Sequence, residues 1–426
     1  MESKPKLFNK NFFLLWQGQF VSQLGDQAFM IAMMFWIKHQ TGSASLMGLL
    51  MTAAMLPAVL LGPITGTFAD HYSRKKIIVY SDIVRSIPVL LLAGIVFFFP
   101  GSTELGITTL FAVTLLLGIV GALFNPAIMA SIPDIVPEEK VAAANSLSQA
   151  TRQISLFFGQ ALGGFLFVLF GAPALFLIDG ISFLFSGFSE TFIKIPQKIP
   201  EKSTDWREKF KQFKADMMFG LKFSWEHTGL RALFFAAAFI NFFVMPIILL
   251  LPFYVEDFLG TTPDWYGYIL AAFGFGSLVG YGIAGALKIP ANLKSGVFIV
   301  SLILMAACLP ALILMYKPLH ALLLMGVFGM FNGFFNINIF TILQLAVPGD
   351  IRGRIFGLLF TLTGGLAPIS MGLTGFIFDL LNQDLVLIYS VCGSITIILC
   401  TVTAFNKEFR KFLRYEKKEE PVTEAI

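Results

Sequence analysis

A short polar stripe interrupts the first long apolar segment of the chain. Within residues 12–37, Asp26 lies beside Gln23 and Gln27, and Gln19 lies two turns earlier. At 100° per residue, these four side chains project to one side of a helix. A carboxyl among apolar surroundings is costly, and one that is retained usually has a function. We therefore expect proton transfer or polar ligand binding at this stripe.

Methionines continue the same stripe along the segment. Met30, Met33 and Met34 share the side of the helix that holds Asp26. Methionine side chains adapt to many apolar shapes, which suits a loosely selective cavity. Burial disfavours the charged form of a carboxyl. Asp26 could therefore carry a proton across a membrane, or it could form a permanent pair that only supports packing.

Other polar side chains within long apolar segments are candidates for the same cavity. Arg152 belongs to a stripe of polar and small residues, and it could face the cavity or pair within the packing. Asp179 could be a second proton site or an interfacial helix cap. Asn241, Asn332 and Asn336 are cavity candidates in the second half of the chain, where hydrogen bonding between helices is the alternative.

The composition is typical of a protein that crosses a membrane many times. Of the 426 residues, 56% are hydrophobic and only 13% are charged, whereas soluble domains contain about 25% charged residues. Apolar runs of about 20 residues suit a helix that crosses a bilayer. The expected fold is therefore an all-α membrane protein with twelve transmembrane helices. They are expected at roughly 12–37, 46–69, 77–99, 106–131, 142–170, 174–194, 230–255, 265–287, 295–316, 319–345, 354–380 and 386–405.

The basic residues indicate which side of the membrane holds the chain ends. An even number of spans puts both termini on one side. Of the 30 Lys and Arg residues, only Lys38 and Lys317 fall in segments on the opposite side, and Arg85 and Arg152 lie within spans. Because loops rich in Lys and Arg stay in the cytoplasm, we expect both termini there.

Two related sets of six spans form the expected domain organisation. Phe124 and Asn125 in the fourth span match Phe335 and Asn336 in the tenth, in stretches that are similar to each other. Duplicated units of this kind are typical of carriers that rock two bundles about a central site. The expected parts are an N-terminal bundle, a cytoplasmic linker with an amphipathic helix, a C-terminal bundle and a cytoplasmic tail, at residues 1–194, 195–229, 230–405 and 406–426.

The loop after the second span carries a recognisable signature, GTFADHYSRKK. It resembles the loop motif Gly-x-x-x-Asp-Arg-x-Gly-Arg-Lys of the major facilitator superfamily through Gly66, Asp70, Arg74 and Lys75, and two other positions depart from the motif. In that family the loop is a gate latch between the two halves, which implies a conformational role for these residues. Without the resemblance, the stretch would be a basic loop that sets the topology.

Two further clusters have a structural interpretation. Asp82 and Arg85 are three residues apart at the start of the third span, and we interpret them as an ion pair that supports the gate. The stretch SLFFGQALGG resembles the antiporter motif of the superfamily at Gly159, Gly163 and Gly164, but it lacks the proline of that motif. Small residues at these positions also allow close helix packing.

Shorter stretches resemble the bacterial macrolide-efflux and enterobactin-exporter branch of the superfamily. They are SQLGD, TGSAS and LIDGISF, at residues 22–26, 41–45 and 177–183. This resemblance implies a protein of the bacterial cytoplasmic membrane that exports drugs or siderophores. SQLGD followed by an apolar run is also similar to bacterial lysophospholipid carriers. Movement of lysophospholipids between leaflets is therefore the alternative function.

The expected function is secondary-active transport of a hydrophobic or amphiphilic small molecule by alternating access. The proton gradient would supply the energy, without a cofactor or a metal. We expect a monomer surrounded by membrane lipids, with no nucleic-acid partner. An enzyme is not expected, because the four His are scattered and no His or Cys pair has the spacing of metal ligands. A scaffold or sensor would need a partner domain, which the charged tail does not supply.

Overall fold

Long helices make up nearly all of the protein. The computed structural model describes residues 7–197, 206–287, 289–347 and 351–413, and this part of the chain contains no strand. The helices are α1 (Lys10–Thr41), α2 (Ala44–His71), α3 (Arg74–Phe98), α4 (Thr103–Ile135), α5 (Val141–Thr191), α6 (Trp206–Glu226), α7 (Thr228–Leu249), α8 (Leu251–Phe253), α9 (Asp264–Ala286), α10 (Ala291–Ala311), α11 (Pro318–Ala346), α12 (Arg352–Leu380), α13 (Leu385–Phe405) and α14 (Lys407–Leu413). A π-helical turn, Tyr254–Phe258, follows α8.

Capping residues set the sharp turn between α1 and α2. Asn9 accepts a hydrogen bond from the Phe12 amide at 3.0 Å, and Ser43 accepts one from the Leu46 amide at 3.2 Å. Each bond satisfies an amide that has no partner in the first turn of its helix. Gly42 ends α1 with φ 63°, a left-handed conformation that glycine adopts without strain. The local sequence therefore determines where α1 ends and α2 begins.

Helix α5 contains two membrane spans, residues 141–170 and 172–191, because the chain reverses at Gly171. This glycine has φ 71° and ψ 179°, which is not helical. Trp16 and Gln17, neighbours on α1, show the reversal: they bond to Thr151 in the first span of α5 at 2.7 Å and to Ser189 in the second at 2.8 Å. In the described residues, eleven helices are long and apolar enough to cross a membrane. With the reversal inside α5 the number of spans is twelve, as predicted.

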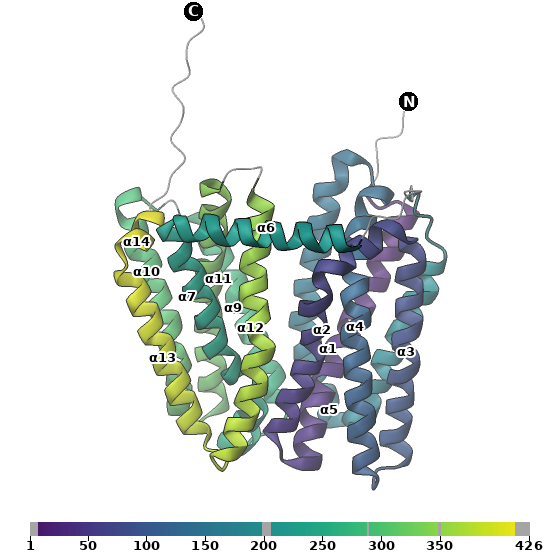
Figure 1. Ribbon diagram of the computed structural model, residues 1–426. Helices are drawn as coiled ribbons and strands as arrows, with labels where there is room; N and C mark the ends of the chain where they lie inside the picture. The colour runs from purple at the N-terminus through teal and green to yellow at the C-terminus, as the bar shows by residue number, and fades with distance from the viewer. Residues whose placement is uncertain (1–6, 198–205, 288, 348–350, 414–426) are drawn as a thin grey trace, which may run out of the picture.

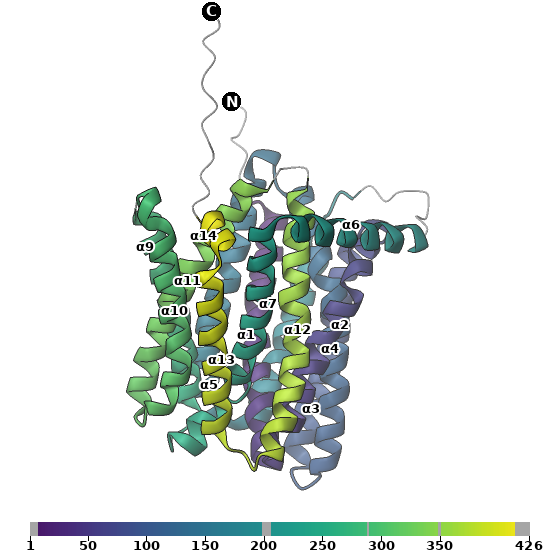
Figure 2. The ribbon, with the colours of Figure 1, turned by 60° about the vertical axis from the view of Figure 1, so that its left-hand side comes forward.

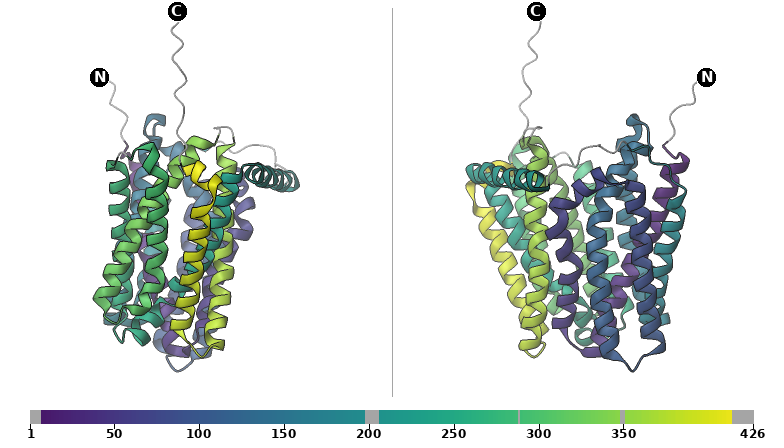
Figure 3. Two further views of the ribbon diagram at one scale, coloured as in Figure 1. Left: turned by 90° about the vertical axis from the view of Figure 1, so that its left-hand side faces the viewer. Right: turned by 45° about the vertical axis from the view of Figure 1, so that its right-hand side comes forward.

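The helices form two groups that stand side by side, α1–α5 and α7–α13 (Figure 1). Helix α6, which lies within the predicted linker, runs across one end of both groups. Figure 2 and Figure 3 show from other directions that the described chain begins and ends near that same end. We call it the terminal end and the opposite one the far end.

Close contacts between α2 and α12 and between α5 and α9 join the two groups. Glycines make these contacts possible. A side chain on Gly375 of α12 would collide with the carbonyl of Ala44 in α2, and one on Gly267 of α9 would collide with the carbonyl of Gln160 in α5. Small residues let helix backbones approach closely in a membrane. These glycines therefore fix how near the two halves come.

Candidate functional site

A polar pocket of about 330 Å³ lies within the first group of helices. Gln19, Gln23, Asp26 and Gln27 of α1 line it, and Arg152 of α5 lies in the same wall. All five were predicted from the sequence to face a cavity. Helical periodicity brings the four α1 residues to one side, and the contact between α1 and α5 adds the arginine.

Arg85 of α3 also lines this pocket, which the sequence did not predict. The ion pair predicted between Arg85 and Asp82 is present. The Arg85 guanidinium lies 4.1 Å from the centre of the Phe124 ring and 4.4 Å from that of Phe183. Cation–π contacts and a charge-assisted hydrogen bond hold a buried guanidinium in place. A fixed positive charge therefore lies at the wall of the pocket.

A mainly apolar pocket of about 400 Å³ lies within the second group of helices. Its polar groups include the three asparagines predicted to line a cavity, Asn241, Asn332 and Asn336. Phe335 and Asn336 line this pocket, and their counterparts in the sequence repeat, Phe124 and Asn125, line the polar pocket. The two pockets therefore occupy related positions in the two halves.

The methionines of the predicted stripe lie outside both pockets. Met33 is buried and accepts a hydrogen bond from the Thr114 hydroxyl at 3.6 Å, and Met34 is buried against the Tyr266 hydroxyl at 3.5 Å. Met30 is 36% exposed and lines neither pocket. Met33 and Met34 thus pack α1 against α4 and α9. Periodicity placed them on the correct side of α1 but could not show where neighbouring helices cover that side.

Asp179 is buried in the contact between α5 and α1, behind the polar pocket. The Ser182 hydroxyl donates to its backbone carbonyl at 2.8 Å and lies 3.5 Å from its Oδ1 atom. Gly25 of α1 packs directly against both side chains. The Oδ2 atom of Asp179 has no hydrogen-bond partner, and Asp26 is a neighbouring charge. The two carboxyls predicted as proton sites are therefore close to each other.

The three glycines of the antiporter-like stretch lie at helix contacts. A side chain on Gly159 would meet Gln27 of α1, and one on Gly163 would also meet α1. Gly164 faces the Pro263 carbonyl, which belongs to the second group of helices. The glycines therefore allow α5 to approach α1 at the polar pocket and α9 across the two halves.

The predicted gating loop connects α2 to α3. The Arg74 guanidinium donates to the Asp134 carboxylate of α4 at 2.5 Å, and Lys75 lies beside Asp134 in a surface pocket. Gly66 and Asp70 fall in the last turns of α2, but their side-chain surroundings lie outside the described residues. The gating role of this loop stays a prediction.

An ion-pair cluster joins the two halves at the far end. The Lys38 side chain on α1 is only 7% exposed, and its Nζ lies 2.6 Å from Glu256 and 2.9 Å from Asp257, in the π-helical turn of the other half. The His39 Nε2 atom lies 2.8 Å from Glu256. The sequence signal for this cluster was the isolated Lys38, because it is one of only two basic residues placed on that side.

Asp379 of α12 makes a second connection at the far end, as a cap for a helix of the other half. Its carboxylate accepts hydrogen bonds from the Ser43 hydroxyl at 2.8 Å and from the Ala44 and Ser45 amides at 3.1 and 2.8 Å. A carboxylate at a helix N-terminus satisfies free amides and interacts favourably with the helix dipole. We call this connection and the Lys38 cluster together the far-end latch.

Twelve spans in two groups, with related pockets in the two halves, define a membrane transporter with a divided central site. The sequence profile of the Major Facilitator Superfamily matches residues 15–371. The chain therefore belongs to this superfamily, as its loop motif suggested. It is an integral membrane transporter and not an enzyme.

Known proteins with similar sequences include efflux proteins. The chain is 24% identical over 404 residues to macrolide efflux protein A of Streptococcus pyogenes, covering 94% of this chain and 96% of the relative. It is 23% identical over 378 residues to the multidrug efflux pump Tap of Mycobacterium bovis, covering 86% and 87% of the two chains. The fold is similar to that of the peptide transporter POT, with a TM-score of 0.70, 12% identity and 93% of each chain covered.

Proposed function

We propose that this transporter exports hydrophobic or amphiphilic small molecules, such as macrolides or siderophores, from the bacterial cytoplasm by alternating access. The division of its central site carries the proposal. One pocket is rich in amide, carboxyl and guanidinium groups, and the related pocket in the other half is mainly apolar. An amphiphile can place its polar part against the first and its apolar part against the second. The relatives that are named for macrolide and multidrug efflux support export.

The proton gradient supplies the energy in this proposal. Asp26 is the carboxyl in the wall of the polar pocket, next to the guanidinium groups of Arg85 and Arg152. Loss or gain of a proton there changes the charge that a ligand meets. The terminal end faces the cytoplasm in this arrangement, because the loops at that end hold most of the basic residues. The protein acts as a monomer in lipid and needs no cofactor.

Transport in liposomes tests the proposal. The parent and the variant Asp26→Asn are reconstituted, a pH gradient is imposed, and the movement of a fluorescent macrolide conjugate is followed. Glu104→Gln, which alters an exposed carboxyl at the start of α4, is the matched control. We expect gradient-dependent movement with the parent and the control, and binding without coupled movement in Asp26→Asn.

Two results would contradict parts of the proposal. Coupled movement in Asp26→Asn would remove Asp26 as the coupling group. Movement of a fluorescent lysophospholipid, with no movement of the macrolide, would favour the lipid-carrier alternative.

A further inference from the structure

A buried polar cluster lies behind the polar pocket, between α1, α3 and the second span of α5. Asp82 of α3 and Glu190 of α5 are both 0% exposed. Their carboxyls face each other, with the Ser186 side chain beside them. Glycine permits this approach, because a Cβ atom on Gly187 would lie only 3.1 Å from the Cβ of Asp82. The helices therefore bring two acidic side chains together away from solvent.

Each carboxyl of the pair has one oxygen with a partner and one without. Asp82 Oδ1 accepts a hydrogen bond from Arg85, and Glu190 Oε1 accepts one from the Gln19 amide at 2.9 Å. Asp82 Oδ2, Glu190 Oε2 and the Ser186 hydroxyl oxygen are buried and have no hydrogen-bond partner. Buried polar atoms without partners are costly, and two adjacent carboxylates also repel each other.

A single proton removes both costs. A proton on one carboxyl creates an O–H group that can donate to the free oxygen of the other. The pair and Arg85 then carry one negative and one positive charge, so their net charge is zero. Without the proton the cluster holds two carboxylates and one guanidinium, which leaves an uncompensated charge in a buried site. The hydrogen-bond partners and the charge balance both require one proton.

The groups that hold this pair also line the polar pocket. Gln19 bonds to Glu190, Arg85 bonds to Asp82, and both side chains reach the pocket wall. The other charged groups nearby are Asp26 and Arg152 at the pocket and Asp179 further along α5. A ligand that brings positive charge into the pocket favours the ionised form of the pair. Proton and cationic ligand therefore oppose each other.

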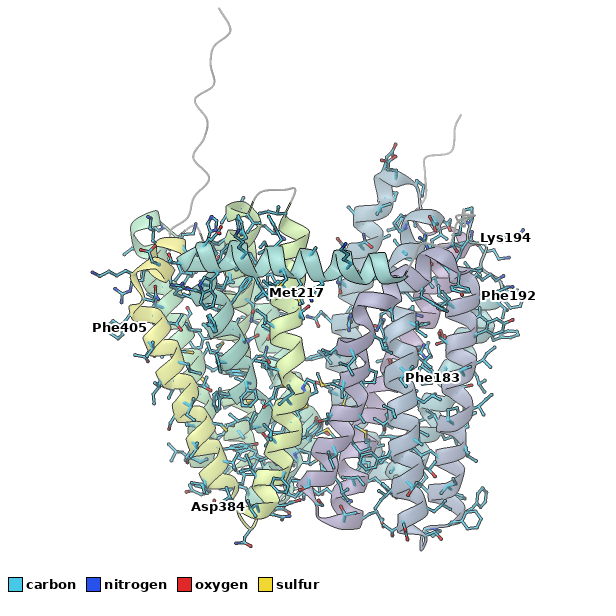
Figure 4. The ribbon with its side chains drawn as sticks, viewed as in Figure 1. Phe183, Phe192, Lys194, Met217, Asp384 and Phe405 are labelled. Carbon is cyan, nitrogen blue, oxygen red and sulfur yellow. The ribbon has the colours of Figure 1, made fainter. Side chains whose placement is uncertain are left out.

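The position of the pair also gives the proton an exit. Glu190 comes two residues before Phe192, and Figure 4 labels Phe192 and Lys194 near the terminal end of the molecule, with Phe183 deeper in the bundle. The pair therefore lies between the pocket and the terminal end.

We propose that Asp82 and Glu190 form a carboxyl–carboxylate pair that holds one proton and releases it when a cationic amphiphile occupies the polar pocket. The use of this proton for transport rests on the proposed function, but the release of the proton on binding does not. Asp26 then serves to bind the ligand, and Gln19 and Arg85 connect the ligand to the pair.

Glu190→Gln tests the pair with little change in shape. The glutamine amide can donate to Asp82 Oδ2, and its oxygen can still accept from Gln19, so the variant imitates the protonated pair permanently. Purified protein in weakly buffered solution is mixed with tetraphenylphosphonium, a permanently charged lipophilic cation, and a pH dye reports proton release. We expect one proton released per cation bound by the parent and none by Glu190→Gln, which still binds the cation.

Two further variants separate the pair from other carboxyls. Glu104→Gln controls for the removal of an exposed carboxyl and should release the proton as the parent does. Asp26→Asn should bind the cation more weakly and still release a proton for each cation that binds. Infrared spectra provide a second measurement, since the band of a protonated carboxyl should be present in the parent and lost in Glu190→Gln.

The outcomes distinguish this inference from the proposed function. Unchanged proton release in Glu190→Gln, loss of release in Asp26→Asn alone, or absence of release in the parent would each overturn the pair. If the parent releases a proton on binding but moves no ligand along a pH gradient in liposomes, the proposed proton coupling fails and the pair stands.

Discussion

Removal of the Asp379 carboxylate should open the far end of the transporter. Asp379 belongs to the C-terminal half but caps helix α2 of the N-terminal half through three hydrogen bonds of 2.8 to 3.1 Å. These bonds exist only while the two halves are together at the far end. Asp379→Ala therefore destabilises the closed arrangement and leaves the open one unchanged.

The size of this effect follows from the contacts. Hydrogen bonds to a charged group contribute about 1.5–3 kcal/mol each when buried. Asp379 is partly exposed, and water can replace some of its bonds after opening. We therefore assign about 2 kcal/mol to the whole cap, which corresponds to about a 30-fold change in the ratio of open to closed protein.

Thiol labelling measures that ratio. Met51 of α2 is 5% exposed, and a cysteine there becomes reachable from the far side only when the halves separate. The native cysteines Cys308, Cys392 and Cys400 are buried. In Met51→Cys protein, the rate of modification by a membrane-impermeant reagent should rise about 30-fold on addition of Asp379→Ala, because the rate scales with the open population.

A matched control is available on the next helix. Asp384 caps its own helix α13 by accepting a hydrogen bond from the Leu387 amide at 2.9 Å, and Figure 4 shows it at the far end. Asp384→Ala removes a cap of the same kind without breaking a bond between the halves. Equal labelling rates in the Asp379→Ala and Asp384→Ala proteins would refute the assignment of Asp379 to the latch.

Three further predictions concern the latch, the helix contacts and the apolar pocket. Lys38→Met should leave Glu256 partly buried without its cation, so the same labelling rate should rise, and the melting temperature should fall because loss of one partner of a buried ion pair costs about 3–5 kcal/mol. Gly375→Val should force α12 away from the Ala44 carbonyl, so a spin-label distance between α2 and α12 should increase. Asn332→Ala should weaken binding of a fluorescent macrolide about fivefold, the loss of about one hydrogen bond, without changing proton release in solution; an unchanged affinity would exclude Asn332 from the ligand contacts.

The sequence by itself determined the membrane fold. Apolar runs of spanning length and their turn residues predicted the twelve spans, because a bilayer allows helices of one length range and forces their polar connections outside. Gly171 illustrates this, since the expected tight turn is where the chain reverses inside α5. The loop motif that begins at Gly66 indicated the superfamily, and the spacing of Gln19, Gln23, Asp26 and Gln27 predicted their common face.

Only the tertiary structure decided which residues meet across helices. Met33 and Met34 share the face of Asp26 but are covered by α4 and α9, and a helical period cannot show what covers a face. Glu190 is distant in sequence from its neighbour Asp82, so nothing local pointed to a pair. The same reason hid the Asp379 cap on α2: its donors lie more than 300 residues earlier in the chain. Such contacts depend on how the helices pack, which the pattern of each separate helix does not contain.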